Sequence, residues 1–161
     1  MTTHHHLVFL MEHYAPRALA TVTVAEGGYE LAFEDALMVQ IFALQDSTNS
    51  EGAIVILTAV LGPVPEDSVG EALVAELMAA QYFPAEPQFL YALEPETGYA
   101  VTSSLRSLEA LEQEVFEEWV SDFIRHASTL RGQLQEAVVA AGASRDSDGA
   151  DDGPVEGGIR I

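Results

Sequence analysis

The segment from Ala53 to Pro65 reads AIVILTAVLGPVP. Its apolar and β-branched run favours a buried strand, and the glycine and prolines at its end stop the strand because proline cannot donate to a sheet ladder. The residues from Ser68 to Ala80 then keep apolar side chains at helical spacing, and Ser68 with Glu71 predicts a capping box at the helix start. Together with the elements on either side, this strand and helix predict an α+β domain.

The residues before this strand predict one helix and further extended segments. The stretch from His4 to Tyr14 is apolar enough for a short helix, which should end near Ala15 because Pro16 cannot occupy a helix interior. Threonine and valine alternate after it, apolar residues alternate again beyond the Gly27-Gly28 turn, and a polar loop suited to a hairpin separates the last two runs. The segments interpreted as extended are Ala20–Val24, Tyr29–Phe33, Leu37–Leu44 and Ala53–Leu61.

A second hairpin and a long final helix follow. Gln88–Glu94 and Tyr99–Leu105 flank the turn Pro95–Gly98, where proline presets the turn and glycine supplies a left-handed backbone conformation. Ser107 can cap a helix whose apolar residues recur at steps of three and four, and Gly142 can serve as the residue just past its end. The expected order is helix, three strands, helix, two strands, helix, with the helices packed on a twisted antiparallel sheet.

The composition of the chain changes at Gly142. Residues 142–161 are rich in glycine and aspartate and almost without large apolar side chains, so we expect them to form a disordered acidic tail. Residues 1–141 are then expected to make up one folded domain, because 161 residues is about the length of a single domain.

The charge balance restricts the partners. The 26 aspartates and glutamates stand against six basic residues, all of them arginine, which gives a formal net charge of −20. This charge repels the phosphates of nucleic acids and anionic lipid headgroups, so we expect neither nucleic acid nor a membrane as partner, whereas a basic or apolar protein surface is admissible. The sequence has no cysteine and shows neither a membrane-spanning run nor a secretory signal, which favours a soluble intracellular protein.

No pattern in the sequence predicts catalysis, a cofactor or a metal. There is no Gly-x-Ser-x-Gly elbow, no phosphate-binding glycine loop and no lysine for a Schiff base. The histidines His4, His5 and His6, with Glu12 and His13, do not have the spacing of a zinc site, because adjacent histidines on a helix cannot all reach one ion. We therefore expect the protein not to be an enzyme.

The second helix is poor in polar residues. Large apolar side chains cover about half of its circumference and alanines fill most of the rest, so it is suited to burial on two sides. In a domain of this size one of those sides would face water. A subunit interface is therefore favoured over a core helix in a monomer. The residues expected in a homodimer interface are Val69, Leu73, Ala75, Leu77, Met78, Phe89 and Tyr91.

Several pieces of the sequence, taken in order, resemble a known family. After the apolar first helix come GGYELAFED (Gly27–Asp35), ILTAVLGPVP (Ile56–Pro65), the helix Glu71–Ala80, the hairpin Phe89–Val101 and VFEEWVSDFI (Val115–Ile124). Their order, with the chain length and the acidity, resembles a class I type III secretion chaperone of the Tir-chaperone (CesT-like) type over residues 7–135. The resemblance implies a cytoplasmic bacterial homodimer that binds a secreted effector, keeps its chaperone-binding segment extended, and delivers it to the export apparatus without ATP hydrolysis.

An effector site can be placed on the expected fold by a separate physical argument. If Tyr29–Phe33 is the first, unpaired strand of the sheet, an extended peptide can add to its edge through backbone hydrogen bonds while its side chains enter apolar pockets. The candidate pocket residues are Leu7, Leu10, Leu31 and Phe33. The same four residues can instead simply pack the first helix on the sheet.

Two other classes of function stay open at this point. An acidic mimic or anti-factor that occupies a basic nucleic-acid-binding protein would also be strongly negative, but its carboxylates should form a regular array on one surface. A small-ligand or enzymatic domain would need a concave pocket with converging polar groups.

Overall fold

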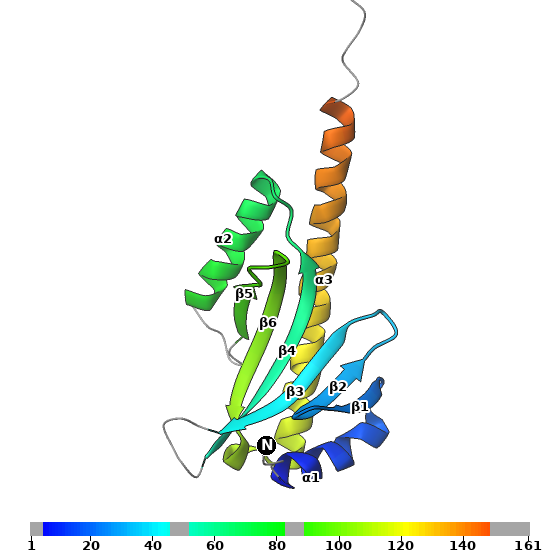
Figure 1. Ribbon diagram of the computed structural model, residues 1–161, viewed down its shortest axis with the longest axis vertical. Coiled ribbons are helices and arrows are strands. Elements are labelled where there is room, and N and C mark those ends of the chain that lie inside the picture. Colours follow the sequence, from blue (N-terminus) through cyan, green and yellow to red (C-terminus); the bar gives the residue numbers. More distant parts are fainter. Residues whose placement is uncertain (1–4, 46–51, 83–88, 149–161) are drawn as a thin grey trace, which may run out of the picture.

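The computed structural model describes residues 5–45, 52–82 and 89–148. Within these residues, three α-helices and six strands follow one another along the chain (Figure 1). Short 3-10 turns follow the first helix at Ala15–Arg17 and precede the last one at Leu108–Ala110. The bounds, in chain order, are α1 His5–Tyr14, β1 Thr21–Ala25, β2 Gly28–Ala32, β3 Met38–Gln45, β4 Ala53–Pro63, α2 Ser68–Tyr82, β5 Phe89–Leu93, β6 Tyr99–Ser107 and α3 Gln113–Asp148.

The six described strands form one antiparallel sheet in the order β1-β2-β3-β4-β6-β5. The α+β class and the antiparallel sheet are confirmed, but the expected order held one strand too few, because Thr21–Ala25 forms a full strand beside β2. The two strands are joined by the two-residue turn Glu26-Gly27, in which Gly27 has a φ of 86° that glycine adopts at little cost. Strands β1 to β4 therefore make a continuous meander.

The core lies between one face of the sheet and the helices α1 and α3. Every second residue of the central strand β4, from Ala53 to Leu61, is buried. Helix α3 covers this row with Phe116, Trp119 and Phe123, each of which is at most 1% exposed. Helix α1 closes the β2 end of the same face with Leu7, Leu10, Met11 and Tyr14.

One buried polar contact fixes the position of α3 along the sheet. The Trp119 Nε1–H group donates to Ser104 Oγ of β6 at 2.9 Å, and both residues are at most 1% exposed. The guanidinium carbon of Arg106, on the same strand, lies 5.5 Å from the centroid of the Trp119 ring. A buried indole N–H that lacks an acceptor costs free energy, so this bond favours one register of α3 on the sheet.

Helix α2 is capped by Asp67. The Oδ1 atom of Asp67 accepts hydrogen bonds from the backbone N–H groups of Val69 at 3.0 Å and Gly70 at 3.1 Å, which is the pattern of an N-cap residue. The capping box predicted from Ser68 and Glu71 is therefore wrong, since the Glu71 N–H bonds to the carbonyl of Asp67. Aspartate and serine are both good caps, and the sequence pattern alone placed the cap one residue too late.

Helix α3 differs from the prediction at both ends. Ser107 precedes a 3-10 turn, its side chain makes no capping bond, and α3 itself begins at Gln113. At the other end α3 passes through Gly142 and runs to Asp148. The alanines around Gly142 favour the helix enough to offset the cost of about 1 kcal/mol for a helical glycine. Residues 142–148 of the predicted tail are thus helical, and residues 149–161 lie outside the described residues.

Replacing Ser104 with alanine should leave the buried Trp119 N–H without its acceptor. We expect the free energy of unfolding of the full chain to fall by about 1–3 kcal/mol, as measured by urea denaturation. Ser121→Ala, on the exposed side of α3, is the matched control and should change it by less than about 0.5 kcal/mol. Equal stability of the two variants would contradict a structural role for the Trp119–Ser104 bond.

A chain truncated after Ala143 should fold as well as the full chain. The last core residue that the structure describes is Ala141, at 8% exposure, so the truncation removes none of the described core. We expect an unchanged thermal midpoint by calorimetry. Truncation after Arg131 is the control and should lower the midpoint, because it removes Leu134, which is 2% exposed. A lower midpoint after the first truncation would mean that residues beyond 143 stabilise the fold.

Candidate partner-binding surface

Three of the four predicted effector-binding residues lie in the core. Leu7 is 4% exposed, and Leu10 and Leu31 are 0% exposed. Phe33 is half-buried and packs against the same core. In the structure these residues pack α1 on the sheet, which is the alternative weighed from the sequence. A partner could reach the three leucines only if α1 moved away, and a role of these residues in effector binding stays a prediction.

The strand expected to lie at the edge of the sheet and accept a peptide lies inside the sheet. Strand β2 was predicted to be the unpaired first strand, but it hydrogen-bonds to β1 on one side and to β3 on the other. The two edges of the sheet are β1 and β5. Alternation of apolar and polar residues marks a segment as a strand but does not show which strands lie beside it, so the assignment of the edge from the sequence was wrong.

The face of the sheet opposite α1 and α3 carries apolar side chains that no described helix covers. Figure 1 looks onto this face, with α3 running behind the sheet. Cross-strand pairing places Phe42, Ile56 and Leu105 in one row and Leu44 and Ile54 in the next. Leu44 is 43% exposed and Leu105 is 40% exposed. We call these five residues the apolar strip.

A polar row separates the apolar strip from the other end of this face. Gln40, Thr58 and Ser103 are neighbours on β3, β4 and β6. Ser103 Oγ donates to Thr58 Oγ1 at 3.1 Å, and Gln40 Nε2 donates to Glu30 Oε1 at 3.2 Å. Since these polar groups already bond within the sheet, they gain less from a covering partner than the apolar strip does. Beyond the polar row the same face is apolar again, with Met38 47% and Val60 52% exposed.

The predicted interface residues of α2 form a partly exposed apolar surface. Val69 is 42% exposed and Met78 is 62% exposed. Ala75 is exposed as well, whereas Leu73 and Leu77 are half-buried. The burial on two sides expected of this helix is thus incomplete in a single chain, and the homodimer stays a prediction.

Phe89 and Tyr91 of β5, also predicted in the interface, contact α3. The Phe89 ring stacks on His126 with 3.9 Å between centroids, and the Tyr91 hydroxyl is hydrogen-bonded to His126 Nε2 at 2.7 Å. Burial lowers the pKa of His126 and raises the pKa of Tyr91, so both rings are neutral at neutral pH. These two residues therefore hold the edge strand on α3.

The arginines whose side chains the structure describes are all engaged within the fold. Burial and the nearby carboxylates of Glu117 and Glu12 raise the pKa of Tyr14 and Tyr29, respectively, as expected in a strongly negative field. Because 26 carboxylates stand against six arginines, most of the carboxylates cannot be paired with an arginine. The negative surface should therefore attract cationic partners. The arginine contacts are Arg17 with Glu117, Arg125 with Asp122, Arg131 with Asp35, and Arg106 with the Trp119 ring.

No group of three or more histidine, aspartate or glutamate side chains within the described ranges could hold a metal ion. None of the helices described here is long and apolar enough to cross a membrane.

Comparison with solved structures identifies the fold. ExsC, in the ExsC-ExsE complex, superposes with a TM-score of 0.59 and 18% identity over 82% of this chain and 95% of ExsC. The Yersinia pestis type III secretion chaperone SycH, solved with a stable fragment of YscM2, gives a TM-score of 0.56 and 13% identity over 80% of this chain and 99% of that one. No family model matches the sequence, and no curated protein matches it significantly.

These matches concern the fold, since the sequences are 18% and 13% identical. They cover about four fifths of this chain, and they confirm at the level of the fold the resemblance found in the sequence. The chain therefore has the fold of the type III secretion chaperones.

Proposed function

We propose that the protein is a cytoplasmic chaperone of a bacterial type III secretion system. It binds the chaperone-binding segment of a secreted effector, keeps that segment extended and competent for export, and passes it to the export apparatus. It acts as a homodimer by binding alone, without a catalytic step, cofactor or metal, and its partners are neither nucleic acids nor membranes. The fold shared with ExsC and SycH, each solved with a bound protein partner, supports this proposal.

The observation that carries the proposal is the uncovered apolar strip. A chain with a net charge of −20 can expose apolar side chains and stay dissolved, because its copies repel one another. A partner that covers the strip removes apolar surface from water, which stabilises the complex by about 25 cal/mol per Å² buried. The strip crosses three strands that lie about 4.8 Å apart, so it suits a short extended segment.

The β1 edge supports a second contact with the same kind of partner. Its backbone groups on the outer side have no neighbouring strand in the described chain, and an extended segment can add there by backbone hydrogen bonds. Val24 on this strand is 77% exposed and gives such a segment an apolar contact. An unprotected edge also promotes aggregation between copies, which the negative charge of the chain opposes.

The homodimer is proposed to form through α2 and β5. Besides Val69 and Met78 on α2, Leu93 on β5 is 44% exposed, and α2 contacts β5, so both elements contribute apolar surface to the proposed interface. A twofold axis through this surface would bury the same residues on both copies. Because β1 and β5 are opposite edges of the sheet, such a dimer leaves the β1 edges free for partners.

Mimicry of nucleic acid by an acidic surface is less well supported. A mimic requires a regular array of carboxylates, whereas the uncovered face of the sheet carries the apolar strip, the polar row and, beyond that row, the exposed apolar side chains of Met38 and Val60. The overall negative charge is common to both functions and does not distinguish them.

Leu105→Glu should abolish most of the partner binding without unfolding the chain. Leu105 is 40% exposed, so a carboxylate there can stay hydrated in the free protein but would be covered by an apolar partner segment. We expect the affinity for the native partner to fall at least about tenfold, or about 1.4 kcal/mol. The partner is first identified by co-purification from the native bacterium, and its bound segment is then titrated by calorimetry.

Val139→Glu is the matched control, because Val139 is 72% exposed on α3, away from the apolar strip. Two folded variants that bind the partner equally would show that the site is not on the strip. Leu31→Glu is unsuitable as a test, since Leu31 is 0% exposed and the variant would bury an unpaired carboxylate. The chaperone role itself requires that secretion of the co-purified protein falls when the gene is deleted, and unchanged secretion would refute it.

Met78→Asp should convert the dimer into a monomer. At 62% exposure the aspartate is compatible with the folded chain, but in the proposed interface it would be an unpaired buried charge. Sedimentation equilibrium at micromolar concentration should give a dimer mass for the wild type and a monomer mass for the variant. Val24→Asp, on the β1 edge, should remain dimeric, and a wild-type monomer would contradict the proposed interface.

A further inference from the structure

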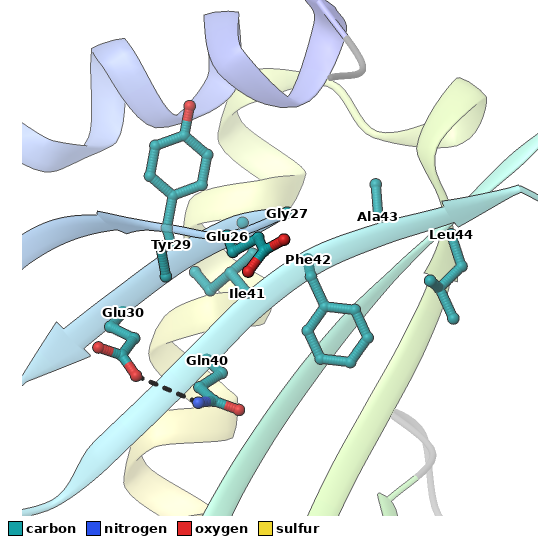
Figure 2. A pocket seen from close by; sticks show the side chains of 11 residues that line it. Glu26, Gly27, Tyr29, Glu30, Gln40, Ile41, Phe42, Ala43 and Leu44 are labelled. Carbon is teal, nitrogen blue, oxygen red and sulfur yellow. Dashed lines mark hydrogen bonds between the residues drawn. The ribbon is translucent and has the colours of Figure 1, made fainter. Parts of the chain in front are cut away.

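At one corner of the sheet, β3 extends beyond the first residue of its antiparallel neighbour β2. Pairing of β2 with β3 stops at Gly28 opposite Phe42, whereas β3 continues to Gln45. A cavity of about 130 Å³ lies at this corner, lined by the β1–β2 turn, the start of β2 and the second half of β3 (Figure 2). We call this cavity the edge pocket.

Position 28, at the border of the edge pocket, requires a glycine. A Cβ atom at position 28 would lie 2.2 Å from the carbonyl oxygen of Ile41 and 2.8 Å from Cβ of Phe42. Both distances are shorter than the contacts that Cβ atoms make in proteins. The nearer atom belongs to the backbone, which cannot rotate away as a side chain can. Residue 28 is therefore restricted to glycine, and no side chain from this position can fill the edge pocket.

Two carboxylates border the edge pocket. Glu26 and Glu30 line it, and Glu30 Oε1 accepts a hydrogen bond from Gln40 Nε2 at 3.2 Å. The arginine side chains that the structure describes are engaged at other places, so this part of the chain supplies no cation to the pocket. Figure 2 shows that Glu30, Gln40 and Phe42 point to the same side of the sheet, away from the helix toward which Tyr29 points.

We propose that the edge pocket binds an arginine side chain of an extended partner segment. The inference rests on the proposed function and adds to it the chemistry of one partner residue. A guanidinium group is planar, donates hydrogen bonds to two carboxylates at once, and stacks on an aromatic ring such as Phe42. The cavity of about 130 Å³ is large enough for the end of one side chain, since a single water molecule needs only about 10–15 Å³ of such space.

The backbone beside the pocket can hold the segment that carries this arginine. Ala43 and Leu44 pair with β4 on one side, while β2 does not extend to them on the other. A chain laid along them continues the sheet by backbone hydrogen bonds. Leu44 also belongs to the apolar strip, so the same segment can place an arginine in the pocket and an apolar side chain on the strip. The net charge of −20 favours the approach of such a cationic segment.

The test uses two capped tripeptides, acetyl-Val-Arg-Val-amide and acetyl-Val-norleucine-Val-amide, titrated into the full ¹⁵N-labelled chain at about 0.15 M salt, where distant charges are screened. We expect the arginine peptide to shift the amide resonances of Gly28, Glu30 and Leu44 and to bind at least fivefold more tightly than the norleucine peptide. The double variant Glu26→Gln, Glu30→Gln should weaken the arginine peptide at least fivefold. It keeps an acceptor for Gln40, so the sheet is not disturbed.

The matched control is Glu94→Gln with Glu96→Gln, which removes the same charge from the exposed β5–β6 turn and should leave the affinity unchanged. Equal weakening by both double variants would overturn the proposal, because only the overall charge would then matter. Equal binding of the two tripeptides would overturn it as well. A lysine tripeptide that binds as tightly as the arginine one would refute the assignment of arginine.

Failure of this inference can be told apart from failure of the proposed function, because the tripeptides need no native partner. Suppose that the native partner binds and that Leu105→Glu abolishes this binding, but that the arginine tripeptide binds no more tightly than the norleucine tripeptide. In that case only the proposal for the edge pocket is refuted. If the arginine tripeptide behaves as expected and no secreted protein depends on the chain, only the chaperone role is refuted.

Discussion

The packing of α3 on β4 is the contact on which the rest of the structure depends. Alternate residues of β4 are buried beneath the aromatic side chains of α3, and the flanking strands β3 and β6 add their own inward residues to the same core. The Trp119–Ser104 bond fixes the register of this contact. Because α1 packs on the same face, the described chain has α1 and α3 on one side of the sheet, and no described helix covers the apolar strip on the other side.

The strands could be predicted from the sequence to within one or two residues, because alternation, the β-branched runs and the glycine and proline turns are local signals. The neighbours of a strand are set by contacts far apart in the sequence, so the position of β2 inside the sheet could not be predicted. The N-cap of α2 was also predicted wrongly, because Asp67 and Ser68 are adjacent and both residue types are good caps. Alanine-rich surroundings likewise extended α3 past Gly142.

An apolar site on the sheet could be predicted from the sequence, but not the residues that form it. Leu7, Leu10 and Leu31 are apolar residues on the right elements, but their periodicity is the same whether they face a partner or the core, and the structure places them in the core. A usable signal was present in β3 and β4, where Phe42, Ile54 and Ile56 are apolar although they alternate with the buried residues. A strand that is apolar on both faces needs cover on both faces, and here one cover is absent from the described chain.

The length of α3 affects how the molecule moves in solution. Its 36 residues span about 54 Å, whereas the 11 residues of β4, the longest strand described, span about 36 Å, so the helix projects beyond the sheet (Figure 1). An elongated particle experiences more hydrodynamic drag than a sphere of equal mass. A single copy of this 17.3 kDa chain will therefore elute early from a sizing column and tumble anisotropically. Its subunit number has to be taken from a measurement of mass, since its apparent size overstates it.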